Sequence, residues 1–150
     1  GCYVHGNEPS HHVAYMYNWA DKPWKTQERI HQIITTMYLN KPDGLCGNDD
    51  CGQMSAWYIF SSLGFYPVCP GSGQYAIGSP SVKEGAIQLS EGKKLVVKAN
   101  NLSEKNIYIQ SVKLNGKSLN TSFISHSDIV GGGELVFEMG NRPNKKWATK

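Results

Sequence analysis

The chain has 150 residues, enough for one domain or for parts of two, and its formal net charge is only +3. Its lysines and arginines are dispersed rather than arranged in a stripe, which argues against a nucleic acid partner. No run of about 18 apolar residues occurs, so the sequence predicts no membrane span, and the first residues lack the basic and apolar parts of a signal peptide.

Before residue 65 the apolar residues keep helical spacing, which predicts three helices, over 11–20, 24–39 and about 52–63. Ser10 is placed to cap the first helix, and Pro23 suits the first turn of the second. Gly64 follows the third helix, where a left-handed C-terminal cap is expected. The second helix carries a stripe predicted to be buried, formed by Ile30, Ile33, Ile34, Met37 and Tyr38.

After Pro67 the pattern changes to short alternating runs divided by glycine, asparagine and proline. Asn115-Gly116 is the strongest hairpin signal in the chain, and the glycine run 131–133 also predicts a hairpin turn. We therefore expect an antiparallel β region over about 74–138. Its strands are expected at 86–89, 95–99, 107–114 and 134–138.

The predicted helices carry more apolar surface than three helices can bury among themselves. Much of this surface is aromatic. We therefore expect further helices that are absent here, and we interpret the chain as the tail of a longer protein. The aromatic residues concerned are Tyr15, Tyr17, Trp19, Trp24, Trp57 and Tyr58.

The segment 44–57 carries the densest group of polar side chains. Asn48, Asp49 and Asp50 lie between glycines, directly before the third predicted helix. The glycines let the backbone adopt conformations closed to other residues and let a ligand approach closely. Three oxygen-bearing side chains at this junction suit a polar ligand, a cation or an activated water. The alternative is that Asp49 or Asp50 caps the helix that follows.

The four cysteines have no Cys-x-x-Cys spacing, and the histidines lie far from them in the chain, so a zinc site is not expected. One disulfide, Cys46–Cys51 or Cys46–Cys69, is conceivable in an exported protein, and the spacing does not decide between them. The fourth cysteine is Cys2.

An ordered set of motifs resembles glycoside hydrolase family 92, the calcium-dependent exo-acting α-mannosidases abundant in gut Bacteroidetes. Together the motifs span residues 6 to about 140, essentially the whole chain. They are Gly-Asn-Glu-Pro-Ser-His-His at 6–12, Pro-Trp-Lys-Thr-Gln-Glu-Arg at 23–29, Asp-Gly-Leu-Cys-Gly-Asn-Asp-Asp-Cys-Gly-Gln-Met-Ser-Ala-Trp at 43–57, Leu-Gly-Phe-Tyr-Pro at 63–67, Tyr-Ala-Ile-Gly-Ser-Pro at 75–80 and Ser-His-Ser-Asp-Ile at 125–129.

The resemblance implies an α+β chain in two parts. Residues 1–66 would be the last helices of an (α/α)6 catalytic barrel with active-site loops, and residues 67–150 an antiparallel β-rich region. The rest of the barrel and an N-terminal β-sandwich would lie upstream in the same protein. The family's general acid belongs to an upstream motif that this sequence lacks, so this chain alone is not expected to hydrolyse mannosides.

The resemblance also implies a catalytic role for the segment 48–50. Inverting hydrolysis needs one carboxylic acid to protonate the leaving oxygen and one carboxylate to activate water on the opposite face. The family carries paired acids two positions apart here, so Asp50 is predicted to be the general base. Asn48 fills the companion position, where an amide can orient water but cannot take its proton. Asp49 would point away from the site if the segment is extended.

The motif 6–12 is the second candidate site. Glu8 precedes a proline, which favours an extended conformation at a loop-to-helix entry. The resemblance places substrate-binding residues here: Asn7, Glu8, His11 and His12. In the alternative interpretation Glu8 complements the dipole of the helix that follows, and the histidines are packed, hydrogen-bonded residues.

The calcium ion implied by the resemblance would take oxygen ligands. Candidates on this chain are Glu8, Asn48 and Asp50, and further ligands would lie upstream. The Asn-Asp-Asp-Cys-Gly run does not have the spacing of an EF-hand loop.

The sequence favours the C-terminal part of an exo-α-mannosidase that cleaves α-mannosidic bonds of glycans, with α-1,2 as the expected linkage. One alternative is a related glycosidase with another substrate. The other is a non-catalytic carbohydrate-binding or assembly module built on the β region. The resemblance implies a periplasmic, cell-surface or secreted location.

Overall fold

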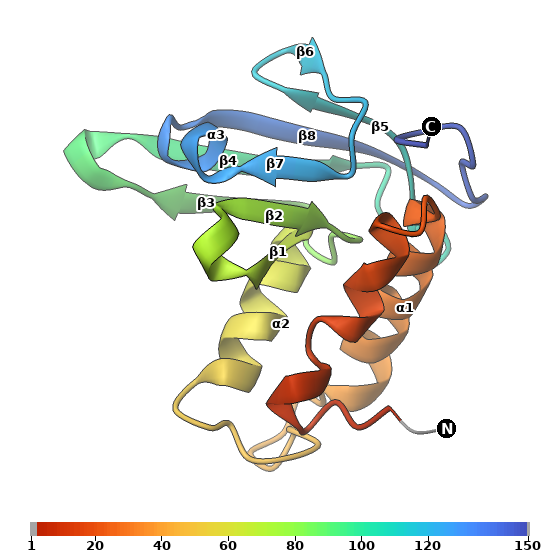
Figure 1. The fold of residues 1–150 in the computed structure, drawn as a ribbon, viewed down its shortest axis with the longest axis vertical. Coiled ribbons are helices and arrows are strands. Elements are labelled where there is room, and N and C mark those ends of the chain that lie inside the picture. Colours follow the sequence, from red (N-terminus) through yellow and green to blue (C-terminus); the bar gives the residue numbers. More distant parts are fainter. Residues whose placement is uncertain (1–2, 150) are drawn as a thin grey trace.

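The computed structural model describes residues 3–149, in which a helical layer packs against two β-sheets (Figure 1). The chain begins with two short 3-10 helices, η1 (Glu8–Ser10) and η2 (Val13–Asn18), followed by the α-helices α1 (Pro23–Met37) and α2 (Gln53–Leu63). The strands all follow α2. Among the described residues no helix is both long and apolar enough to cross a membrane.

The α-helix expected over 11–20 is replaced by 3-10 turns, and Ser10 makes no side-chain cap hydrogen bond there. In a 3-10 helix residues three apart share a face. Tyr15 and Asn18 are accordingly buried, whereas Val13 and Met16, predicted to belong to the apolar stripe, are exposed. The α-helical period predicted for residues 11–20 is therefore wrong.

The other two predicted helices are present. Helix α1 has Pro23 at its first position and ends at Met37, and Ile30, Ile33 and Ile34 of its predicted stripe are buried. Met37 and Tyr38, also assigned to that stripe, are only half-buried, and Tyr38 lies beyond the end of the helix. Helix α2 ends at Gly64, whose φ of 96° is in the left-handed region and whose N–H donates to the carbonyls of the preceding turn.

A three-stranded antiparallel sheet follows α2 directly and was not predicted. It contains β1 (Phe65–Cys69), β2 (Gln74–Ile77) and β7 (Phe123–Ser125), in the order β1-β2-β7. The division expected at 66/67 falls inside β1. Pro67 and the short length of these strands hid the period-two pattern on which strand prediction depends.

The second sheet has five strands in the order β3-β4-β8-β5-β6. Strand β8 lies between β4 and β5, parallel to β4 and antiparallel to β5, so the sheet is mixed rather than wholly antiparallel. The α+β class is confirmed. The strands are β3 (Glu84–Gln88), β4 (Lys94–Asn100), β5 (Tyr108–Leu114), β6 (Lys117–Ser118) and β8 (Gly133–Gly140).

The two turn predictions had different outcomes. Asn115 and Gly116 have φ values of 50° and 77° and join β5 to β6 as a hairpin, as predicted. The glycine run 131–133 is not a hairpin turn, because it follows a short helix, α3 (His126–Val130), and leads into β8. Ser125 and Asp128 start that helix with a reciprocal capping box.

The helical layer and the sheets are held together by buried polar contacts as well as apolar packing. The Gln27 side-chain carbonyl accepts a hydrogen bond from the Ile109 N–H at 3.0 Å. The Asn18 amide donates to the carbonyls of Ile77 and Ser122 at 2.9 and 3.2 Å. These contacts fix α1 and η2 against the sheets, and so set the position of the loops at the opposite end of the helical layer (Figure 1).

Candidate active site

Two loops that carry candidate site residues touch through their glycines. A Cβ atom added to Gly6 would lie 2.7 Å from the carbonyl oxygen of Cys46, and one added to Gly47 would lie 2.7 Å from the Cα of Gly6. Such distances leave no room for any side chain. The glycines therefore let the backbones of the two loops approach closely, at the end of the helical layer far from the sheets (Figure 1).

Four of the predicted site residues are presented beside this contact. Asn7 and Glu8 follow Gly6, and Asn48 and Asp50 follow Gly47 closely; all four are exposed. Within residues 3–149 their side chains have no hydrogen-bond partner, so these side chains are free to bind a ligand. The structure thus brings together two motifs separated by about forty positions in the sequence.

The backbone after Asn48 is not extended. Asp50, Cys51 and Gly52 all have positive φ, at 49°, 58° and 93°. A residue other than glycine held in this region costs on the order of 1–3 kcal/mol, and such residues concentrate at functional sites. The segment is therefore not extended through Asp50, which is the condition under which Asp49 was expected to point away from the site.

Asp49 turns toward helix α2 as a result of this backbone. Its carboxylate accepts hydrogen bonds from the backbone N–H of Ser55 at 2.9 Å and from the Ser55 hydroxyl at 3.1 Å. Asp49 therefore satisfies a donor of the first turn of α2, as in the capping alternative. Its neighbour Asp50 has no such bond and is free at the surface.

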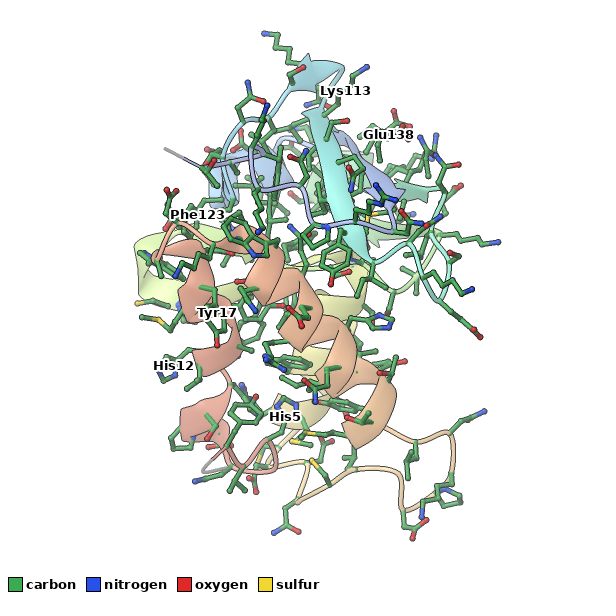
Figure 2. The ribbon with its side chains drawn as sticks, turned by 90° about the vertical axis from the view of Figure 1, so that its right-hand side faces the viewer. His5, His12, Tyr17, Lys113, Phe123 and Glu138 are labelled. Atoms are coloured by element: carbon green, nitrogen blue, oxygen red, sulfur yellow. The ribbon has the colours of Figure 1, made fainter. Side chains whose placement is uncertain are left out.

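The two candidate histidines lie in different environments. His11 is only 2% exposed, and its Nε2–H donates to the His5 carbonyl at 2.9 Å while its Nδ1 lies 3.1 Å from the Gln53 amide nitrogen. Trp57 donates to its backbone carbonyl at 3.1 Å. The structure thus places His11 in the interior, below the exposed side chains. His12 is exposed at the edge of the layer, as Figure 2 shows.

His5 is a buried residue that the sequence analysis did not single out. It is 2% exposed and lies inside the helical layer (Figure 2), with its Nδ1 2.7 Å from the Tyr3 hydroxyl and its Nε2 2.7 Å from the Tyr38 hydroxyl. Burial, with a smaller effect of nearby His11, lowers the pKa of His5 from 6.5 to about 4. Its position directly before Gly6 is the one sequence signal that could have drawn attention to it.

Burial also raises the pKa of the two tyrosines bonded to His5, so both hydroxyls keep their protons. A neutral histidine between two neutral tyrosines can remain in a buried position without an uncompensated charge. Ring contacts reinforce this cluster, since the His5 ring lies edge-on to Trp57 at 4.3 Å between centroids.

The donors on this chain fit a hard cation in kind but not in number. Glu8, Asn48 and Asp50 offer carboxylate and amide oxygens, which calcium prefers, but calcium usually takes six to eight ligands. Among residues 3–149 no group of three or more histidine, cysteine, aspartate or glutamate side chains forms a metal site. A calcium site would need ligands from outside this chain.

Neither disulfide considered for Cys46 is present in the described part of the chain. Cys46, Cys51 and Cys69 are free and exposed. Cys2 lies outside the described residues.

The chain resembles proteins of known structure over its full length. It is 49% identical to the family GH92 α-mannosidase BT3965 from Bacteroides thetaiotaomicron, solved in complex with mannoimidazole, with a TM-score of 0.97. It is 42% identical to the family GH92 inverting mannosidase BT2199 from the same species, with a TM-score of 0.93. In both cases the match covers 100% of this chain and 20% of the other.

A curated relative from the fungus Arthroderma benhamiae is described as an uncharacterized secreted glycosidase. It is 33% identical over 147 residues, which are 96% of this chain and 19% of the relative. The chain therefore spans about one fifth of the length of these relatives. The model of the glycosyl hydrolase family 92 catalytic domain matches residues 1–141. The sequence match and the structural similarity point to the same family, and the chain belongs to glycosyl hydrolase family 92.

Proposed function

We propose that the full-length protein containing this chain is a calcium-dependent exo-α-mannosidase that cleaves α-mannosidic bonds, preferably α-1,2, with inversion. The observation that carries this proposal is the backbone contact between Gly6 and Gly47, which presents four exposed polar side chains at one place. Membership of the family and the similarity to two mannosidases support it.

In this proposal Asp50 is the general base. Inversion needs a carboxylate that takes a proton from water while the water attacks the anomeric carbon from the face opposite the leaving group. The Asp50 carboxylate is exposed and has no partner among the described residues, so it is available to accept that proton. Asn48 is exposed nearby and would orient the water, since an amide can both donate and accept hydrogen bonds.

Asn7, Glu8 and His12 would bind the sugar from the neighbouring loop. All three side chains are exposed, those of Asn7 and Glu8 directly after Gly6, and they offer both donors and acceptors for hydroxyl groups. His11 would contribute by holding this loop, because both its ring nitrogens are occupied inside the protein.

Glu8, Asn48 and Asp50 would supply part of the calcium site. When bound, calcium would hold vicinal hydroxyls of mannose and favour distortion of its ring. The remaining ligands and the general acid would come from the part of the protein outside this chain.

The helical layer carries an apolar groove suited to contact with that outside part. The groove lies between η2 and α1 and has a volume of about 710 Å³. We propose that the rest of the catalytic barrel covers it and that the isolated chain is inactive. The residues lining the groove include Tyr3, Val13, Met16, Tyr17, Ile33 and Met37.

We also propose that the enzyme is exported to the periplasm, the cell surface or the medium, in agreement with the secreted glycosidase to which the chain is similar. Its substrates would be mannose-containing glycans.

The test is mannose release by the full-length protein from α-1,2-, α-1,3-, α-1,4- and α-1,6-linked mannobioses, with the first anomer formed identified by NMR. We expect release from the α-1,2 disaccharide with β-mannose as the first product. Release of α-mannose would contradict the inverting mechanism, and release from none of the four disaccharides would contradict the proposed activity.

A further inference from the structure

Beneath the contact between the two loops lies a chain of hydrogen bonds centred on His5. Its ring bonds to the hydroxyls of Tyr3 and Tyr38, and the Tyr38 hydroxyl donates to the carbonyl of Met54 at 3.1 Å. Met54 is in the first turn of α2, directly after the loop that carries Asp50. This series of hydrogen bonds therefore connects the segment before Gly6, the end of α1 and the start of α2.

Only one assignment of donors and acceptors is consistent with all of these hydrogen bonds. Met54 offers a carbonyl, which only accepts, so the single hydroxyl hydrogen of Tyr38 is used there. The Tyr38 oxygen must then accept from His5, which places the ring hydrogen on Nε2. His5 Nδ1 consequently has a free lone pair and accepts from the Tyr3 hydroxyl. With a neutral His5 ring that carries its hydrogen on Nε2, each of these hydrogen bonds has one donor and one acceptor.

A second set of bonds runs in parallel and joins the same segments. The backbone carbonyl of His5 accepts from His11, whose other ring nitrogen meets the Gln53 amide. That amide also donates to the Tyr66 hydroxyl at 3.1 Å. His5 is thus bound through both its ring and its backbone, and both routes end in the first turn of α2.

We propose that His5 is a positioning residue for the candidate active site, because its bond to Tyr38 holds Gly6 against Gly47 and so fixes Glu8 relative to Asp50. Its role in catalysis rests on the proposed function. Its role in loop geometry does not. His5 does not reach the surface, and it acts through the loop that begins at the next residue.

The proposal is tested with the full-length protein and the variant Tyr38→Phe, which removes the hydroxyl that joins His5 to α2. Tyr15→Phe is the control, since it also removes one tyrosine hydroxyl, which bonds to Ser61 at 2.8 Å and not to either loop. Thermal unfolding of both variants shows whether they fold. Tyr3→Phe, at a half-buried residue, replaces Tyr38→Phe if the latter does not fold.

The first measurement is amide hydrogen exchange by mass spectrometry in peptides covering residues 4–11 and 50–56. These peptides contain amides bonded within the loops, such as Asn7 N–H to the Val4 carbonyl and Met54 N–H to the Asp49 carbonyl. Tyr38→Phe should speed exchange about tenfold or more in both peptides, because local opening becomes easier. Tyr15→Phe should leave both peptides unchanged. Wild-type exchange in Tyr38→Phe would overturn the proposal.

The second measurement is steady-state hydrolysis. Tyr38→Phe should lower kcat by about 10²-fold, the effect expected when a reacting group is displaced by about 1 Å, with KM changed much less. In the double variant of His5→Gln and Tyr38→Phe the fold-loss of kcat should be smaller than the product of the two single fold-losses, because both substitutions remove the same hydrogen bond. A product of independent losses would contradict that coupling.

The two failures can be told apart. If the wild-type protein releases no mannose, the proposed function fails, and the exchange experiment still decides whether His5 holds the loops. If mannose is released and Tyr38→Phe retains both wild-type kcat and wild-type exchange, the positioning role fails and the proposed function stands.

Discussion

Replacing Asp50 by asparagine should remove catalysis while leaving the fold intact. Asp50 is exposed, its carboxylate makes no hydrogen bond within residues 3–149, and its φ of 49° is one that asparagine tolerates well. We therefore expect the free energy of unfolding to change by less than about 0.5 kcal/mol. Because an amide cannot take a proton from water, kcat should fall by about 10²–10⁴-fold.

Asp49→Ala provides the contrast one residue away. It removes two hydrogen bonds to Ser55, one of them to a backbone N–H in the first turn of α2. The loss should cost about 1–2 kcal/mol, as for other helix caps. The folded fraction of this variant should keep most of its kcat, since Asp49 faces the helix.

The assay compares kcat for mannobiose hydrolysis with the midpoint of thermal unfolding for the wild-type protein and both variants. The reasoning predicts a loss of activity without a loss of stability at Asp50, and the reverse at Asp49. Unchanged turnover in Asp50→Asn, or a catalytic loss in Asp49→Ala that exceeds that of Asp50→Asn, would refute the assignment of the base.

Three further predictions concern the loops and the cation. The pKa of His5 is 6.5 when the chain is unfolded and about 4 when it is folded, so the free energy of unfolding should fall as the pH is lowered through this window, by about 3 kcal/mol in all. Urea unfolding between pH 7 and pH 4 should show a smaller fall in the free energy of unfolding for His5→Gln than for the wild-type protein. Equal falls in the two proteins would contradict the assignment. Gly47→Ala places a Cβ 2.7 Å from the Gly6 Cα and should lower kcat about tenfold or more. Gly71→Ala is the control, because a Cβ there meets nothing within 4 Å and kcat should be unchanged. Equal kcat in the two variants would contradict the proposed role of the loop contact. Chelation of calcium should abolish mannose release and added calcium should restore it; full activity in the chelator would exclude a calcium requirement.

The parts of the fold that could be predicted are those with long, regular patterns. Ile30, Ile33 and Ile34 identified α1, and Gly64 marked the end of α2, because each signal lies within one helix. The Asn115-Gly116 turn was equally local. The short strands β1, β2 and β7 gave no such pattern, and the parallel pairing of β4 with β8 joins residues about 38 positions apart, for example Leu95 and Gly133.

The candidate site shows the same division. The sequence identified Asn7, Glu8, Asn48 and Asp50 as candidates, and the family resemblance favoured Asp50 over Asp49 as the base. What the structure adds is the place of each carboxylate: that of Asp49 bonds to Ser55, whereas that of Asp50, where the run of positive φ values begins, makes no such bond. The two roles depend on rotations about single bonds, which composition and spacing do not encode.

The sequence by itself determined the family, the α+β class and the two polar motifs, since each is recorded in residue types at fixed spacing. Only the tertiary structure decided that Gly6 meets Gly47, that His11 is buried, and that His5 bonds to one tyrosine two positions before it and another 33 positions after it. The physical reason is that these contacts are formed by packing between segments distant in sequence. Their positions are fixed by the close packing of the whole helical layer rather than by any local preference.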